Sequence, residues 1–186
     1  MFKEVPLNEA TRLINHGPVV LVSSKLGDRT GVTPVAWSMP VQKNPPFIML
    51  EIGRKHFIYE CIGETGDFVV NIPSVKMAET VVGCGSCSGR ETDKISVFGL
   101  SIRPAEKVVS PVISDCPAFL ECELVRDEYL LERGLVKGKV LYAGAEQDAF
   151  SGHWLFENKD YYTLHHLGNK VFCFPGGGLI DLRGKG

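Results

Sequence analysis

The chain alternates short runs of β-branched and aromatic residues with clusters of Gly, Pro and Asp, and this pattern predicts a mainly β protein. Each run is long enough for one strand, and the turn residues between runs favour antiparallel neighbours. Six runs of this kind predict an antiparallel β-barrel with short helices. The predicted strands are Val19–Ser24, Val32–Ser38, Phe47–Ile52, Phe68–Ile72, Phe119–Arg126 and Leu135–Ala145.

Helical spacing of apolar residues predicts three short helices between these runs. The first covers Pro6–Asn15, ends before Gly17 and is expected to plug one end of the barrel. The second covers about His56–Gly63 and has an apolar face formed by Phe57, Ile58, Cys61 and Ile62. The third runs from about Ser74 to Val82 and should end at Gly83. The small, polar segment Cys84–Lys94 is predicted to be a loop.

Composition fits a single domain spanning residues 1–186, because 44% hydrophobic residues are enough for a full core. A formal net charge of -2 disfavours nucleic acid as a partner. No apolar run approaches the roughly 20 residues of a membrane-spanning helix, and the N-terminus lacks a basic start followed by an apolar run. We therefore expect a soluble, cytoplasmic protein that does not bind membranes, with its six cysteines held as thiols.

The segment that begins at Gly31 carries the first group of residues suited to a flat cofactor. Thr33 and Ser38 offer hydroxyl groups, while Pro34 removes a ladder donor and so keeps the strand near a sheet edge or barrel rim. Trp37 could pack against a ring system. Taken alone, Trp37 is equally compatible with a side chain that only fills the core.

The turn Gly53-Arg54-Lys55-His56 lies between a predicted strand and a predicted helix. Free backbone N–H groups, the positive helix end and cationic side chains are what a phosphate monoester needs, and Arg54 can bind it bidentately. A solvated basic turn would have the same sequence. In the third candidate, Asp93-Lys94, the lysine could neutralise a phosphate or a reduced flavin, and the aspartate could cap a following short helix.

Cys84-Gly-Ser-Cys87 has the C-x-x-C spacing of a redox pair or of half a zinc site, although two free thiols in a loop are the simpler interpretation. No second pair of ligands at close spacing accompanies it, so no metal site is predicted. Gly176-Gly-Gly lacks the strand and helix of a dinucleotide fold, and no G-x-S-x-G elbow occurs. No catalytic side chain is therefore predicted.

The sequence resembles the flavin reductase-like, FMN-binding split-barrel family, and within it the flavoredoxin branch. The resemblance rests on six pieces in order along most of the chain, none of them diagnostic alone. They are Pro18-Val-Val-Leu-Val-Ser-Ser, Thr33-Pro-Val-Ala-Trp-Ser-Met-Pro-Val, Asn44-Pro-Pro-Phe-Ile-Met-Leu, Gly66-Asp-Phe-Val-Val-Asn-Ile-Pro, Asp93-Lys94 and Gly134-Leu-Val-Lys-Gly-Lys-Val.

This resemblance implies a homodimer of six-stranded Greek-key barrels, each with one FMN near the subunit interface. The turn from Gly53 to His56 would receive the phosphate, and Lys94 would approach the cofactor from its loop. Phe172 would cover the ring from the C-terminal segment. The residues that would border the flavin are Thr33, Pro34, Val35, Ala36, Trp37 and Ser38.

Two positions depart from the family pattern. Gly31 stands where the family often has Asn, and Glu132-Arg133-Gly134 replaces a turn that often contains His, with Arg133 as the candidate substitute for that histidine.

The implied function is that of an oxidoreductase. Its FMN would take electrons from NADH, NADPH or a protein donor and pass them to free flavin, ferric iron or a redox partner, with the redox chemistry belonging to the cofactor. Two alternatives stay open: an FMN electron carrier with no small-molecule substrate, and a barrel that serves only as a binding module.

Overall fold

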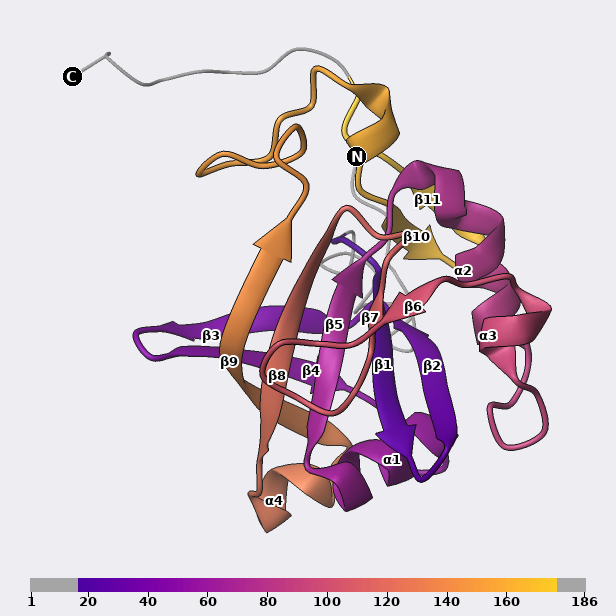
Figure 1. Cartoon of the computed structure of the whole chain (residues 1–186), viewed down its shortest axis with the longest axis vertical. Coiled ribbons are helices and arrows are strands. Elements are labelled where there is room, and N and C mark those ends of the chain that lie inside the picture. The colour runs from indigo at the N-terminus through magenta and orange to yellow at the C-terminus, as the bar shows by residue number, and fades with distance from the viewer. Residues whose placement is uncertain (1–16, 177–186) are drawn as a thin grey trace, which may run out of the picture.

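The computed structural model describes residues 17–176, and seven of its strands form one antiparallel sheet in the order β2-β1-β5-β8-β9-β4-β3 (Figure 1). These strands are β1 (Val20–Leu26), β2 (Arg29–Val35), β3 (Ser38–Lys43), β4 (Pro46–Glu51), β5 (Asp67–Ile72), β8 (Ala118–Val125) and β9 (Leu135–Ala145). Two short pairs accompany it, β6 (Ile102–Arg103) with β7 (Val112–Ile113) and β10 (His165–Gly168) with β11 (Val171–Cys173).

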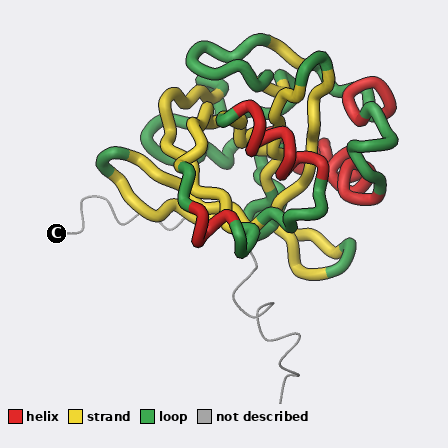
Figure 2. Tube along the Cα trace, turned by 90° about the horizontal axis from the view of Figure 1, so that it is seen from below, coloured by secondary structure: helices red, strands yellow, loops and turns green. Residues whose placement is uncertain are grey.

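The sheet curls into a barrel, because side chains from strands far apart in its order share one core. Val35 of β2 and Leu50 of β4 belong to the same buried cluster, although four strands separate β2 from β4 in the sheet. Helix α1 (Phe57–Thr65) adds Ile58 and Ile62 to this cluster and closes one end of the barrel, shown from below in Figure 2. The predicted mainly β, antiparallel barrel is confirmed.

A second buried cluster covers the outer face of β1 and β2. Leu21 and Val32 point into it, whereas Val20 and Val22 point into the barrel, so β1 is buried on both faces. This burial explains the unbroken apolar run at the start of the strand. The covering elements are the 3₁₀ turn η2 (Val75–Met77), α2 (Ala78–Ser86), α3 (Lys94–Val97) and the segment that carries β6 and β7.

Buried polar side chains attach the segment of β6 and β7 to the barrel. The Asn71 amide donates to the Leu21 carbonyl at 3.0 Å and accepts from the Ile113 N–H at 2.8 Å. Glu121 is fully buried, and its carboxylate accepts from the N–H groups of Glu106 and Lys107. Backbone groups that would otherwise be left unpaired are thereby satisfied.

Helix α1 confirms the second predicted helix. Its four buried residues are the four whose spacing predicted it, and Gly66 ends it in the left-handed conformation at φ 79°. The first predicted helix, Pro6–Asn15, lies outside the described residues. Within residues 17–176, no helix is both long and apolar enough to cross a membrane.

Two predicted boundaries are wrong. The run Val32–Ser38 is not one strand, since β2 ends at Val35 and β3 begins at Ser38. The exposed, proline-containing β3 has no apolar pattern to reveal it, and it is the seventh strand of the main sheet. The third helix does not end at Gly83, because α2 continues to Ser86. Cys84 therefore belongs to α2 rather than to a loop. Gly83 has a packing role instead: a Cβ on it would lie only 2.4 Å from a ring carbon of Phe98, so glycine is needed for the ring to pack against the helix. Two further short helical segments are α4 (Glu128–Leu131) and η3 (Lys159–Tyr161).

We predict that Asn71→Ala lowers the free energy of unfolding by about 1–3 kcal/mol, because buried backbone groups lose their partners. Urea denaturation followed by circular dichroism measures the change. Gln147→Ala removes an exposed amide and is the matched control. Equal stability of the two variants would contradict a structural role for Asn71.

Candidate functional site

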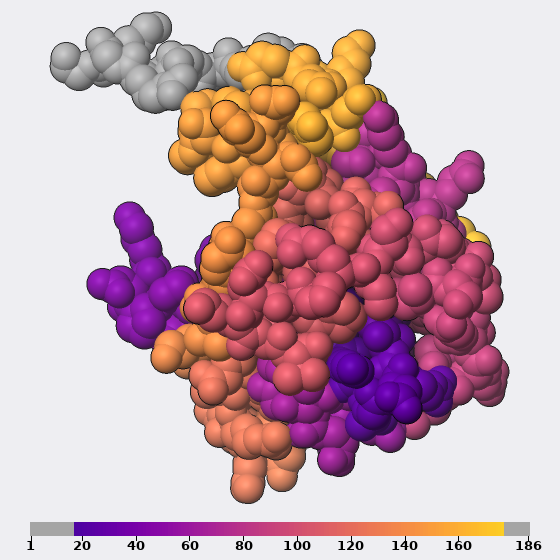
Figure 3. Space-filling model, viewed as in Figure 1, coloured from indigo at the N-terminus to yellow at the C-terminus, as the bar shows by residue number. Residues whose placement is uncertain are grey.

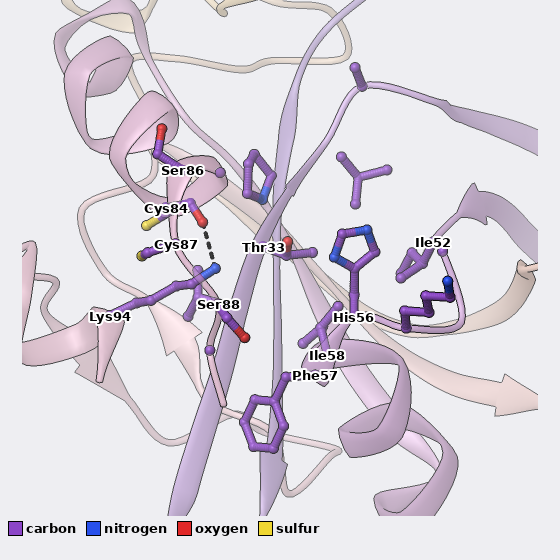
Figure 4. Close-up of a pocket in the computed structure, with 18 of the residues that line it drawn as sticks. Thr33, Ile52, His56, Phe57, Ile58, Cys84, Ser86, Cys87, Ser88 and Lys94 are labelled. Atoms are coloured by element: carbon purple, nitrogen blue, oxygen red, sulfur yellow. Dashed lines mark hydrogen bonds between the residues drawn. The ribbon is translucent and has the colours of Figure 1, made fainter. Parts of the chain in front are cut away.

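A cavity of about 550 Å³ opens at the rim of the barrel, where three segments distant in sequence meet (Figure 4). The segments are the end of β2 with its connection to β3, the turn between β4 and α1, and the end of α2 with the loop that follows. Its size lies within the ~300–1,000 Å³ typical of small-molecule sites. It is lined by residues 32–37, 51–53, 55–58, 84–89 and Lys94.

The connection from β2 to β3 forms the first wall. Thr33, Pro34, Val35, Ala36 and Trp37 all line the cavity, and these are five of the six residues that the resemblance expects to border a flavin. The Trp37 carbonyl accepts from the Glu51 N–H at 2.9 Å, which ties this wall to β4. Trp37 is 48% exposed, so the alternative of a core-filling tryptophan is wrong.

Ser38 does not line the cavity. It is the first residue of β3 and pairs with Leu50 of β4. The predicted group of flavin-bordering residues is thus divided at the point where the chain passes from one strand to the next.

The turn between β4 and α1 forms the second wall. Gly53, Lys55 and His56 line the cavity and also an adjoining surface hollow of about 430 Å³. Arg54 lines only this outer hollow, where its guanidinium reaches the Glu132 carbonyl at 3.5 Å. A Cβ at Gly53 would stand 2.9 Å from the His56 ring, so glycine lets the imidazole fold over the turn.

Arg133, the proposed substitute for the family histidine, lies in the same hollow as Arg54 rather than in the cavity. Its guanidinium carbon lies 3.6 Å from the centre of the Tyr129 ring, and the group donates to the Tyr129 carbonyl. These contacts keep it against α4.

The end of α2 and the following loop form the third wall. Lys94 is only 4% exposed, and its amine donates to the Cys84 carbonyl. Burial lowers the pKa of Lys94. Asp93 caps α3 by accepting from the N–H groups of Ile95 and Ser96, as predicted, and the hydrogen bonds from Ser96 lower the pKa of Asp93.

Two glycines allow this third wall to approach the others. A Cβ at Gly85 would stand 3.1 Å from the Pro34 ring, and one at Gly89 would stand 3.0 Å from the Phe57 ring. A larger residue at Gly85 would push the end of α2 away from β2, and one at Gly89 would push the loop away from α1, so either change would widen the cavity.

Arg29 fixes the loop from outside. Its guanidinium donates to the carbonyls of Gly89 and Arg90, at 2.6 and 2.8 Å, and stacks over the Phe57 ring at 4.5 Å. Arg90 itself forms an ion pair with Glu60 of α1 at 2.5 Å. These two arginines bind the loop to both neighbouring walls.

Sequence reasoning missed the lining side chains of the third wall. Ser86, Ser88 and Gly89 reach the cavity only because α2 continues past Gly83 and Arg29 holds the loop in place. The small, polar composition of Cys84–Lys94 is the available signal, but it predicts only a loop in which Lys94 approaches the cofactor and does not indicate Ser86, Ser88 or Gly89.

Phe172 is not brought to this cavity. It lines a neighbouring one of about 310 Å³, where its ring centre lies 5.4 Å from that of His166. The two cavities share Pro34, Ala36, Gly85 and Ser86 as a common wall.

Comparison with known proteins agrees with this architecture. Residues 12–165 match the sequence profile of the family described as "Flavin reductase like domain". The chain belongs to the flavin reductase-like family. The resemblance inferred from the six sequence pieces is thereby confirmed.

Relatives within the family share nearly the full length of the chain. "Uncharacterized protein YddH" of Escherichia coli K12 is 33% identical over 184 residues, which cover 94% of this chain and 95% of that protein. The solved structure of an FMN-binding domain of flavin reductases-like enzyme from Shewanella baltica has a TM-score of 0.84 at 27% identity and covers 95% of each chain. Flavoredoxin of Desulfovibrio vulgaris has the same fold, with a TM-score of 0.79, 22% identity and coverage of 90% and 91%.

Proposed function

We propose that the cavity binds FMN and that the protein is an oxidoreductase. It would take electrons from NADH, NADPH or a protein donor and pass them to free flavin, ferric iron or a redox partner. The observation that carries the proposal is the cavity itself, which combines apolar walls, hydroxyl groups and cations contributed by three separate segments.

The lining residues suit the three chemical parts of FMN. Trp37 and apolar side chains of the barrel rim, such as Val35 and Ile52, offer surfaces for a flat ring system. Ser86 and Ser88 offer hydroxyls to a polyol chain. Lys55 and His56 on one wall and Lys94 on another offer partners for the phosphate and for the polar edge of the ring.

These nitrogen groups lie on opposite walls. Figure 4 shows His56 on one side and Lys94 on the other, with Thr33 between them. Lys55 and His56 directly precede α1, with His56 as its N-cap, and the N-terminal end of the helix also favours an anion, so this side would hold the phosphate. The buried Lys94 would then face the ring, where an ammonium favours negative charge on the reduced form.

The protein's contribution to turnover is binding, orientation and electrostatics. When bound, FMN would supply the hydride and electron transfer. Trp37 and Pro34 would fix the plane of the ring, and Lys94 would hold a positive charge beside it. Because the cofactor would carry out the redox chemistry and the protein would only bind and orient it, such a site needs no catalytic triad.

The proposal is tested by the visible absorption spectrum of the purified protein with excess FMN, followed by anaerobic titration with NADH and NADPH. We expect a protein-bound flavin spectrum that bleaches with a nucleotide. Bleaching only with a chemical reductant would favour the electron-carrier alternative. A protein that stays colourless with excess FMN would refute the flavin assignment and leave a binding module.

The phosphate assignment predicts that Lys55→Ala weakens FMN binding about tenfold, a change of ~1.4 kcal/mol, because a charged contact to the phosphate is lost. Fluorescence quenching of FMN measures Kd. Arg54→Ala, which removes the neighbouring cation that faces away from the cavity, is the matched control and should change Kd much less. If Arg54→Ala has the larger effect, the phosphate lies in the outer hollow instead.

We also propose that the protein is a homodimer, as the resemblance implies. The hairpin of β3 and β4 stands out from the body (Figure 3) and exposes Met39 by 57% and Val41 by 38%, beside Trp37 at the cavity. Large apolar side chains gathered on a protruding hairpin favour a protein partner, and a second copy would bury them next to the cofactor.

The dimer proposal predicts that Met39→Glu shifts the protein towards the monomer, because dimerisation would bury the new charge. Sedimentation velocity over a range of concentrations measures the shift. Val97→Glu adds the same charge at another exposed apolar position, on α3, and should leave the mass unchanged. A monomeric native protein would contradict the proposal directly.

A further inference from the structure

Cys84 and Cys87 stand at the end of α2, and both line the proposed cofactor cavity. Residues three apart on a helix lie on the same face, with Cβ atoms about 5–6 Å apart. Cys87 is the C-cap, with an extended backbone at φ -133° and ψ 158°, so it has left the helix and is not held by the helical ladder. A disulfide requires Cβ atoms ~3.5–4.5 Å apart, so closing the bond requires a movement of the Cys87 backbone, which lies outside the regular helix.

The sulfur of Cys87 already points back along the helix. It lies 3.6 Å from the Gly83 carbonyl, one turn earlier and next to Cys84 in the chain. Figure 4 shows the two cysteines close together, beside the Lys94 amine. Burial lowers the pKa of Lys94, and the neighbouring Cys87 and Cys84 sulfurs act against this shift. Besides burial, Cys87 also contributes to the raised pKa of Cys84.

The two thiols differ in access. Cys87 is partly exposed, whereas Cys84 is fully buried, and burial raises the pKa of the Cys84 thiol to about 11. An incoming reagent therefore reaches Cys87 first, and Cys84 can act only on a sulfur that Cys87 has brought to it.

The remaining cysteines offer no second pair of this kind. Cys61, Cys116 and Cys122 are buried in the packing of the barrel and its outer layer, and Cys173 is on β11. Among residues 17–176, no group of three or more His, Cys, Asp or Glu is placed to hold a metal ion. Cys84 and Cys87 alone have C-x-x-C spacing, lie at the end of the same helix and line the same cavity.

We propose that Cys84 and Cys87 form a dithiol–disulfide couple that takes two electrons from the reduced flavin of the same cavity and passes them to a disulfide-containing acceptor. The proposal rests on the flavin assignment made above. Its acceptor class is a small-molecule or protein disulfide, whose sulfur must reach the partly exposed Cys87.

The two half-reactions balance. The Cys87 thiolate attacks the acceptor disulfide and forms a mixed disulfide as one acceptor thiol leaves. Cys84 then attacks the sulfur of Cys87, which releases the second acceptor thiol and closes the bond between Cys84 and Cys87. Reduced flavin, when bound, would supply the two electrons and two protons that return Cys84 and Cys87 to thiols and would itself become oxidised.

The first test follows the thiols without flavin. The full chain is equilibrated in glutathione buffers of decreasing reducing power, then denatured so that Cys84 becomes accessible, alkylated and digested with trypsin. We expect peptide 77–90, which contains both cysteines, to change from a doubly alkylated form to an unalkylated one that is two hydrogens lighter than its dithiol. Cys173→Ser should behave like the native chain, and Cys87→Ser should never form the internal bond. Double alkylation under all conditions would overturn the proposal.

The second test counts electrons. Oxidised, FMN-loaded protein is titrated anaerobically with dithionite, and we expect it to accept about twice as many reducing equivalents per flavin as Cys87→Ser, since the disulfide is a second two-electron acceptor. FMN binding with equal equivalents in the two proteins would overturn the dithiol couple alone. A disulfide in a protein that binds no FMN would overturn the flavin assignment and, with it, this electron transfer.

Discussion

The burial of β1 on both faces is the constraint on which the site depends. Val20 and Val22 complete the barrel core, so the outward-pointing Leu21 needs a cover of its own. Helix α2 and the segment of β6 and β7 provide it, and buried hydrogen bonds from Asn71 hold that segment in place. Because α2 must lie on this face, its end arrives at the barrel rim beside β2 and the start of α1. The cavity is where these three elements meet.

Close approach at the rim then decides the shape of the cavity. Gly83 lets α2 run beneath Phe98, Gly85 lets it meet Pro34, and Gly89 lets the loop meet Phe57. The same approach carries Cys84, Cys87 and Lys94 to the wall. The covering layer of the barrel thus supplies the polar and reactive groups, whereas the barrel supplies the apolar surface.

The sequence predicted those features that depend on local pattern. Helix α1 followed from the spacing of its four buried residues, and the strands followed from their β-branched runs. The end of α2 was not predictable, because Gly83 resembles a helix terminator in the sequence. Its role is to leave room for the ring of Phe98, a contact that the local pattern does not reveal. Composition identified the turn after β4 as basic, but the place of each side chain depends on the turn geometry, which puts Lys55 on both the cavity and the outer hollow and Arg54 on the outer hollow alone. Phe172 lines the neighbouring cavity instead, because the hairpin of β10 and β11 lies beside α2, and Pro34 stands between the two cavities.

The two arginines that hold the loop of the third wall differ in kind from the packed barrel. Arg29 and Arg90 are exposed, and they act through carbonyl hydrogen bonds, a stacked ring and the ion pair with Glu60. Contacts of this kind weaken as salt screens the charges, whereas burial in the barrel does not. One wall of the cavity can therefore loosen while the barrel stays folded. Ionic strength would accordingly change how fast a ligand enters and leaves, with little effect on the melting of the protein.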